Sequence, residues 1–192
     1  MSQNLKKFLF ISGAIIILIA VLFVLSGGKF PQIKKQEVKN NCPVKEKQEI
    51  VRGDSLEPLI KNGQEIKILY GYYKCSEVKR GDIVAYDYKG NPEPIIKIVK
   101  AIPGDKFSFQ KEETGWRILI NDEILKNSEN IPYLINENSY KLLRLYEKSF
   151  NGVAPENTYI ILGNQPGGTL DSTRFGLIDK NDIIGRVEIK IK

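Results

Sequence analysis

Ser55 lies in the segment VRGDSLEPLI, residues 51–60, between an Arg-Gly-Asp turn and Leu-Glu-Pro, where a serine could serve as a nucleophile. The chain contains no histidine, which excludes a Ser-His-Asp triad, Cys-His catalysis and a histidine-ligated zinc site. Two cysteines cannot supply the four thiolates of a structural zinc site, and no phosphate-binding glycine loop is present. We therefore expect no metal and no cofactor, and a nucleophilic Ser55 would need a lysine or a carboxylate as its base.

A lysine acts as a base only if its surroundings disfavour the ammonium form, because its ordinary pKa of about 10.4 leaves under a thousandth of it neutral at pH 7. The apolar strand candidate PIIKIVKA, residues 94–101, carries two lysines. Its alternation places Lys97 on the face of Val99 and Lys100 on the opposite face. Either lysine could instead bury its stem and leave its amine in water, and periodicity does not choose between the two.

The chain from Glu49 onward consists of short alternating segments broken by turn residues, which predicts a mostly antiparallel β domain. The best candidate for an amphipathic helix is residues 138–149, and no internal repeat is visible. The strand candidates are residues 64–70, 81–88, 95–101, 116–122, 158–163 and 183–191.

The N-terminus contains an uncharged apolar run of 18 residues, 8–25, which as a helix would span roughly 27 Å, close to the thickness of the bilayer hydrocarbon. The sequence Val24-Leu25-Ser26 that follows is a poor exit for a cleaved signal peptide, so we favour a retained anchor. We assign residues 1–7 to a cytoplasmic tail and 8–28 to the transmembrane anchor. Residues 29–48, with six lysines, are assigned to a basic stalk that could lie on lipid headgroups.

The charge pattern bears on partners and orientation. The net charge is +6, but the basic residues are scattered and no nucleic-acid-binding pattern is present, so we expect no nucleic acid as partner. The lysines flanking the apolar run favour a cytoplasmic C-terminus, although long C-terminal domains are exported regardless of such charges. Cys42 and Cys75 would suit a disulfide in an oxidising compartment, and two buried thiols are the alternative.

Four segments together resemble bacterial type I signal peptidases, in the order expected of that family. They are VRGDSLEPLI, RGDIVAY, IIKIVKAIPGD and ILGNQPGGTLDSTRFG, and the resemblance covers about residues 49–191 plus the anchor. The family's nucleophile lies in Gly-x-Ser-Met-x-Pro, which matches Ser55 with Leu56 in place of methionine. The family's base is a strand lysine at a fixed distance before Pro-Gly-Asp. This spacing selects Lys97 over Lys100 and leaves Asp105 as a turn residue.

The last segment departs from the family pattern at several positions. Thr169 falls on the serine that hydrogen-bonds the base, and Asp171 and Ser172 fall on an Asp-Ser pair. The position expected to hold arginine is Thr173, and Arg174 follows one place later. We expect Thr169 to supply the missing hydroxyl, and Asp171 and Arg174 to support the site through a salt bridge.

The resemblance implies a membrane-bound serine endopeptidase that cleaves signal peptides from exported preproteins. Ser55 would attack the scissile carbonyl while neutral Lys97 accepts its proton, and the backbone N–H of Ser55 would meet the oxyanion. The implied substrates are secretory preproteins with small residues at the first and third positions before the cut, bound as an added β-strand. We expect the shallow substrate pockets to be lined by Leu56, Pro58, Leu59 and Ile60.

The implied fold is mostly β: a signal-peptidase and repressor-protease-like β fold with two subdomains, preceded by one transmembrane helix. Residues 49–105 and 158–192 would form the catalytic β core and 106–157 a β cap, with WRILINDEIL as a hairpin at its edge. The domain would lie on the extracytoplasmic side of the cell membrane, with the lipid bilayer as a partner. A self-cleaving repressor protease would carry a DNA-binding head instead of the apolar run, and a non-catalytic membrane-anchored β module is the remaining alternative.

Overall fold

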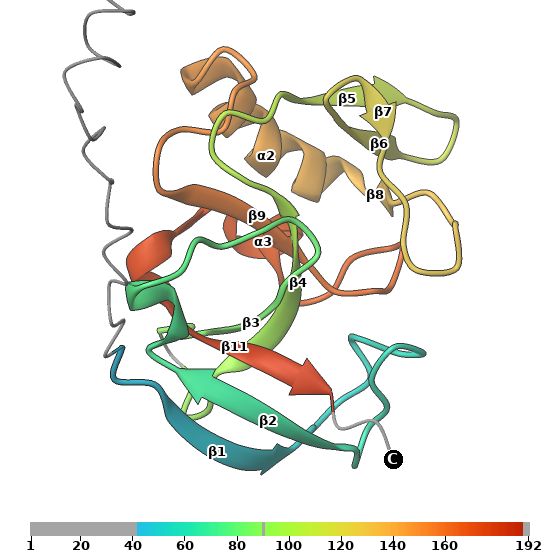
Figure 1. Cartoon of the computed structure of the whole chain (residues 1–192). Helices are drawn as coiled ribbons and strands as arrows, with labels where there is room; N and C mark the ends of the chain where they lie inside the picture. The colour runs from blue at the N-terminus through green and yellow to red at the C-terminus, as the bar shows by residue number, and fades with distance from the viewer. Residues whose placement is uncertain (1–41, 90, 190–192) are drawn as a thin grey trace, which may run out of the picture. The chain divides into compact units, whose positions relative to one another are not determined.

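The computed structural model describes residues 42–89 and 91–189 (Figure 1). The predicted tail 1–7, the predicted anchor 8–28 and residues 29–41 of the predicted stalk lie outside the described residues. Within the described part of the chain, no helix has the length and apolarity needed to cross a membrane.

Seven antiparallel strands form the larger sheet, in the order β1-β2-β11-β3-β4-β9-β10. The six strand candidates from the sequence are all confirmed, five of them in this sheet, because their alternating apolar residues fit a pleated surface with a buried face. The strands are β1 (Lys45–Ile50), β2 (Glu65–Tyr70), β3 (Ile83–Tyr86), β4 (Ile95–Ala101), β9 (Thr158–Leu162), β10 (Ile178–Asp179) and β11 (Ile183–Ile189).

Strand β1 differs from the sequence prediction, because the stalk was assigned through residue 48 and β1 begins at Lys45. All six of its residues pair with β2, although five of the six side chains are exposed. The sequence KEKQ has no apolar alternation to indicate a strand, and charged side chains are typical of a sheet edge exposed to water. The larger sheet therefore begins inside the segment that was assigned to the stalk.

A second, four-stranded sheet comes from residues 107–135, within the predicted cap. Its strands are β5 (Phe107–Lys111), β6 (Trp116–Ile120), β7 (Glu123–Ile124) and β8 (Leu134–Ile135). The hairpin predicted for WRILINDEIL is confirmed: β6 and β7 pair across Asn121 and Asp122, both with positive φ as a tight hairpin turn requires.

One longer helix, α2 (Glu137–Ser149), follows the second sheet and confirms the helix predicted for residues 138–149. Asn136 caps it, accepting a hydrogen bond from the backbone N–H of Ser139. Leu143 is fully buried against the second sheet, and the ring of Tyr140 stacks on Trp116 at 3.5 Å. Three shorter helical turns complete the described part of the chain: η1 (Tyr72–Lys74), α3 (Ser172–Phe175) and η2 (Lys180–Asp182).

One of the three apolar clusters holds the turn that contains Ser55. Val51, Leu56 and Ile60 are 6%, 1% and 0% exposed, and they pack against β2, β3, β4 and β11. Because buried side chains lie on both sides of Ser55, the polar turn between them is fixed to the sheet.

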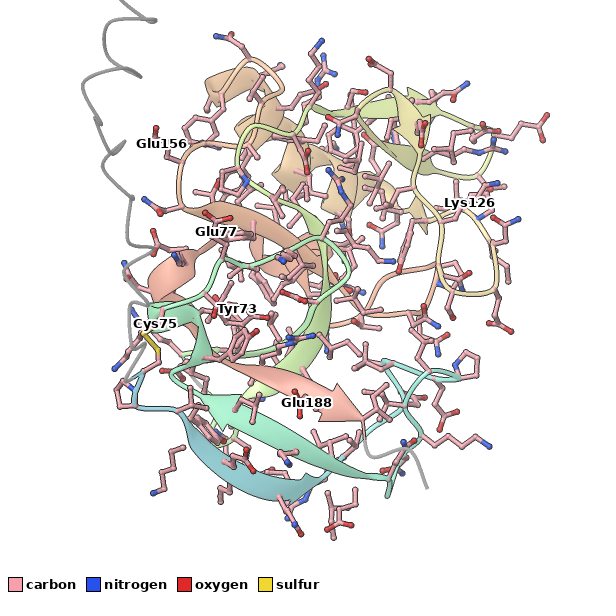
Figure 2. The ribbon with its side chains drawn as sticks, viewed as in Figure 1. Tyr73, Cys75, Glu77, Lys126, Glu156 and Glu188 are labelled. Carbon is pink, nitrogen blue, oxygen red and sulfur yellow. A yellow bond between two sulfur atoms is a disulfide. The ribbon has the colours of Figure 1, made fainter. Side chains whose placement is uncertain are left out.

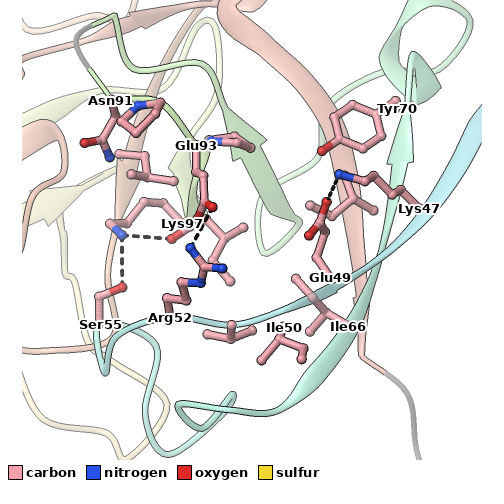
Figure 3. A pocket seen from close by; sticks show the side chains of 16 residues that line it. Lys47, Glu49, Ile50, Arg52, Ser55, Ile66, Tyr70, Asn91, Glu93 and Lys97 are labelled. Atoms are coloured by element: carbon pink, nitrogen blue, oxygen red, sulfur yellow. Dashed lines mark hydrogen bonds and ion pairs between the residues drawn. The ribbon is translucent and has the colours of Figure 1, made fainter.

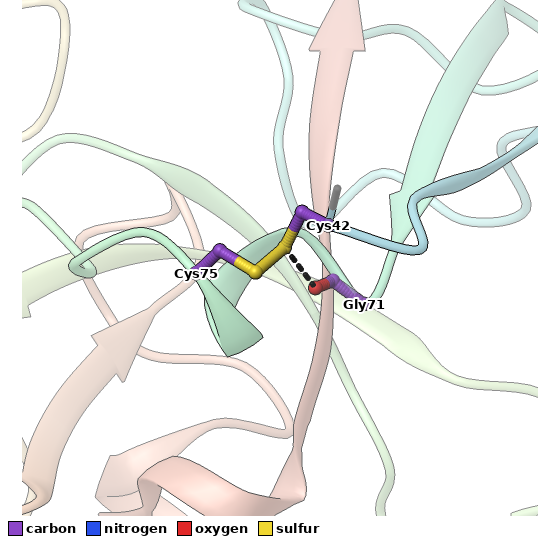
Figure 4. Close-up of a disulfide and its surroundings, with 3 residues drawn as sticks. All are labelled: Cys42, Gly71 and Cys75. Atoms are coloured by element: carbon purple, nitrogen blue, oxygen red, sulfur yellow. Dashed lines mark hydrogen bonds between the residues drawn. A yellow bond between two sulfur atoms is a disulfide. The ribbon is translucent and has the colours of Figure 1, made fainter. Parts of the chain in front are cut away.

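Cys42 and Cys75 form a disulfide (Figures 2 and 4). The bond joins the residue three places before β1 to the residue after η1, with the two Cα atoms 5.9 Å apart. The alternative of two buried thiols is therefore wrong. Since the side chains of β1 contribute little to the core, the disulfide is the covalent attachment that holds the start of this strand to the sheet.

Replacing both cysteines by serine should lower the free energy of unfolding by about 3 to 4 kcal/mol, because a loop of 33 residues would regain its freedom in the unfolded chain. Urea unfolding with and without reductant measures this. Reductant should lower the urea midpoint of the wild type to that of the serine variant. The midpoint of the variant should not change with reductant. Two free thiols by mass measurement under non-reducing conditions would contradict the disulfide.

Candidate active site

The structure brings Ser55 and Lys97 together (Figure 3). The Nζ of Lys97, from the middle of β4, donates to the Oγ of Ser55 at 3.0 Å and to the carbonyl oxygen of Ile96 at 2.9 Å. Lys100, the other lysine of this strand, donates instead to the carbonyl oxygen of Lys126 at 3.3 Å. The contact between Ser55 and Lys97 has the geometry of a nucleophile beside its base.

Burial changes the chemistry of the Lys97 amine. Lys97 is 4% exposed, and desolvation lowers its pKa from 10.5 to about 8, while the negative charge of Asp171 acts in the opposite direction. A pKa of about 8 leaves roughly a tenth of the amine neutral at pH 7, some hundreds of times more than in an ordinary lysine. The amine can therefore accept a proton near neutral pH.

Asp171 is fully buried and holds together the loop beside the site. Its carboxylate accepts five hydrogen bonds, from the backbone N–H of Gly163 and from the N–H and hydroxyl groups of Thr169 and Thr173. It is also the N-cap of α3. Neutral donors thus surround the carboxylate, and its charge remains available to act on Lys97.

The predicted salt bridge between Asp171 and Arg174 is wrong. Arg174 is exposed, and its only hydrogen bond to Asp171 runs from its backbone N–H to the Asp171 carbonyl oxygen at 2.7 Å. Thr173 takes the expected position of the arginine, 1% exposed, and bonds the carboxylate from both its backbone and its hydroxyl. The one-residue shift places Arg174 on the outer side of the short helix.

Thr169 and Ser172 lie beside the site, but Thr169 does not bond the Lys97 amine as expected. The Thr169 hydroxyl donates to Asp171 at 2.7 Å, and among the described residues the Lys97 amine bonds only Ser55 and Ile96. Ser172 is buried and accepts a hydrogen bond from the N–H of Ile161 in β9. Thr169 therefore orders the loop around Asp171, and Ser172 fixes α3 against β9.

Asn164 fixes the backbone of the serine turn, a role the sequence did not reveal. It is 1% exposed, its N–H donates to the Ser55 carbonyl oxygen at 2.6 Å, and its side chain donates to the Glu57 carbonyl oxygen at 2.9 Å. Gly163 permits this close approach, since a Cβ there would lie 2.5 Å from the Thr169 hydroxyl and 2.8 Å from the Ser55 carbonyl oxygen. An asparagine after a strand carries no distinctive pattern.

The second sheet's connecting segments support the same loop. Tyr133 donates its hydroxyl hydrogen to the Gly163 carbonyl oxygen at 2.6 Å, and Asn127 donates from its side chain to the Asn164 carbonyl oxygen. Asp105 is structural, as the sequence predicts: it is 7% exposed and bonds Arg80 at 2.6 Å and the side chain of Asn121. Residues of the predicted cap thus stabilise the segment after β9 that contacts the serine turn.

A cavity of about 360 Å³ opens beside Ser55 and Lys97 (Figure 3). One wall is formed by β1 and residues 51–55, the other by residues 91–97, and the buried side chains of Val51, Ile66 and Ile68 line it. None of the residues predicted to line substrate pockets lines this cavity: Leu56 and Ile60 lie in the core, and Pro58 and Leu59 are exposed outside it. In sequence, apolar residues around a nucleophile fit a pocket or a core equally well, and here Leu56 and Ile60 pack in the core.

Known proteins resemble this chain over most of its length. The model of the family "Signal peptidase, peptidase S26" matches residues 45–191. Signal peptidase IB of Staphylococcus aureus (strain COL) is 24% identical over 153 residues, which cover 73% of this chain and 74% of that protein. A protein named inactive signal peptidase IA from the same strain is 26% identical over 141 residues, covering 73% of this chain and 76% of its own.

Among solved structures, a signal peptidase I from Enterococcus faecalis V583 matches with a TM-score of 0.40 and 23% identity. The match covers 58% of this chain and 97% of that one.

Lys97→Met should increase the free energy of unfolding at pH 7 by up to about 3 kcal/mol, less the loss of two hydrogen bonds. The folded state binds the Lys97 proton more weakly than the unfolded state, so the buried ammonium lowers the stability of the wild type. This destabilisation is complete below about pH 8 and disappears as the pH approaches 10.5. Urea unfolding at several pH values measures the difference between variant and wild type. Lys61→Met, which removes an exposed lysine, is the control, and a difference that does not shrink above pH 8 would contradict the shifted pKa.

Proposed function

The chain belongs to the signal peptidase family, peptidase S26, a family of serine hydrolases that includes enzymes cleaving signal peptides, and we propose that Ser55 and Lys97 are its catalytic pair. The observation that carries this proposal is the 3.0 Å contact between the hydroxyl of a half-buried serine and the amine of a buried lysine. Family membership does not decide activity by itself, since one relative is named inactive.

The mechanism follows from the state of the amine. Neutral Lys97 accepts the Ser55 hydroxyl proton as the oxygen attacks the scissile carbonyl, which gives a tetrahedral intermediate and then an ester on Ser55. The resulting ammonium protonates the departing amine, and neutral Lys97 then takes a proton from the water that hydrolyses the ester. A substrate that covers the cavity would exclude water and keep the amine in its neutral form.

The oxyanion would be stabilised by the backbone N–H of Ser55. This N–H donates no hydrogen bond to any other residue in the described part of the chain, so it is available to a developing negative charge. Position 53 is glycine with φ of 95°, and it contributes no side-chain hydroxyl as a second donor.

The substrate would enter the cavity as an extended strand. On the side of β9, the β4 ladder begins at Ile98, so Ile95, Ile96 and Lys97 have no strand partner there among the described residues. An added strand could pair along these residues, and small side chains before the cut would fit against the apolar side chains of Val51, Ile66 and Ile68. We therefore assign secretory preproteins with small residues at the first and third positions before the cut as substrates.

The supporting residues hold Ser55 and Lys97 in position. We assign Asp171, Thr169 and Ser172 to positioning the loop that carries Gly163 and Asn164, and we give Arg174 no part in the reaction. The catalytic part would comprise residues 49–105 and 158–192, extended by strand β1, and residues 106–157 would support it as a cap.

We also infer that residues 8–28 anchor the protein in the cell membrane, with the domain on the extracytoplasmic side. The uncharged run of 8–25 supports the anchor, and the Cys42–Cys75 disulfide fits an oxidising compartment. An anchored enzyme would meet preproteins that are still held in the bilayer by their own apolar segments.

Membrane attachment can be measured directly. The full chain should remain in the membrane fraction after carbonate extraction at high pH, and protease added outside intact cells or spheroplasts should digest the domain. A variant lacking residues 1–28 should be released by extraction. A full chain protected from external protease would contradict the proposed orientation.

Ser55→Ala and Lys97→Ala should each lower kcat/KM for a preprotein with Ala-x-Ala before the cut by at least about a thousandfold. Lys97→Arg should be equally inactive, because arginine does not give up its proton. Wild-type kcat/KM should rise with pH with a midpoint near 8 in the free enzyme, since the neutral amine is the active form. Purified full-length protein in detergent with a labelled preprotein measures all of these.

Lys100→Met is the matched control, because it removes the neighbouring lysine of the same strand from the opposite face. It should retain activity. Full activity of Ser55→Ala or Lys97→Ala would remove the assignment of the pair, and a folded wild type that cleaves no preprotein would support the non-catalytic module.

A further inference from the structure

An ion pair joins the two walls of the cavity beside Ser55. Arg52, three residues before Ser55, meets Glu93, four residues before Lys97, with Nη1 and Oε1 2.7 Å apart (Figure 3). One partner thus belongs to the wall that leads to the nucleophile and the other to the wall that leads to the base. The other ion pair of the lining, Lys47 with Glu49, stays within strand β1 and does not cross.

The pair lies at the mouth of the cavity and not on its floor. The side chains of Arg52 and Glu93 are 77% and 59% exposed, whereas Val51, Ile66 and Ile68 in the same cavity are buried. A chain lying on the apolar floor would therefore have the ion pair on its solvent side. Because both charges are well solvated, the pair is weak and can open when a bulky group pushes against it.

We propose that Arg52 and Glu93 form a clasp over the bound substrate strand and that this clasp disfavours a bulky side chain at the substrate position that faces it. The proposal rests on the proposed function and adds a specificity determinant to it. A small side chain fits beneath the closed pair, whereas a larger one must break the pair first. The penalty for the larger side chain is limited to the strength of one exposed ion pair, about twofold to fivefold in kcat/KM.

The test uses purified full-length protein in detergent and a set of preproteins in which each of the five positions before the cut is Ala or Leu in turn. The ratio of kcat/KM for Ala over Leu is measured at every position. Arg52→Gln and Glu93→Gln should each reduce this ratio at the same position by about twofold to fivefold. The double variant should match either single variant, because the clasp is already open in each.

The control is Arg117→Gln, the same substitution in the half-exposed pair of Arg117 and Glu112, which is not part of the cavity lining. It should leave every ratio at its wild-type value. High salt supplies a second readout: about 1 M NaCl screens an exposed pair, so the wild-type ratio should approach that of the variants while theirs stay constant.

The clasp is refuted if both single variants keep every wild-type ratio, if they alter ratios at different positions, or if their effects multiply in the double variant. These results leave the proposed function intact, because they require a wild type that cleaves. A folded wild type that cleaves none of the preproteins refutes the proposed function, and the clasp with it.

Discussion

The burial of one amine sets the requirements that the rest of the site fulfils. Lys97 is held almost without exposure in the middle of a paired strand, where a charged amine is unfavourable and its pKa falls to about 8. Burying Lys97 lowers the free energy of unfolding near neutral pH, but it makes the amine able to act as a base. The hydroxyl of Ser55 must then be brought to an atom that cannot move, and for this reason the serine turn is fixed from both ends by buried side chains and from behind by Asn164.

Asp171 shows how such a site tolerates a changed motif. A buried carboxylate needs its lone pairs satisfied, by a cation or by neutral donors. In this chain two threonines and a backbone N–H provide five neutral hydrogen bonds, so losing the expected arginine leaves the loop ordered. The loss of the arginine changes the charge balance of the site. Asp171 has no cationic partner among the described residues, so its negative charge raises the pKa of Lys97 and opposes the effect of burial.

Alternation predicted β2, β4 and β11 well because each of these strands has one buried and one less buried face. It failed at β1, whose side chains are nearly all in water and whose position depends on backbone pairing and a disulfide. Choosing Lys97 over Lys100 needed the spacing to Pro-Gly-Asp, since both lysines alternate with apolar residues. Contacts between distant segments, such as Asn164 with Ser55 or Arg52 with Glu93, leave no local pattern and could not be predicted.

A groove that accepts a strand presents a physical conflict. Binding an extended chain requires strand residues that lack a strand partner, as Ile95–Lys97 do on the β9 side, but such an edge together with an apolar floor also invites association between copies of the protein. Charged side chains along both walls reduce that risk, because a second apolar strand edge would have to bury or displace them. Lys47, Glu49, Arg52 and Glu93 occupy these positions. The same charges that protect the empty groove can therefore distinguish between the chains that enter it.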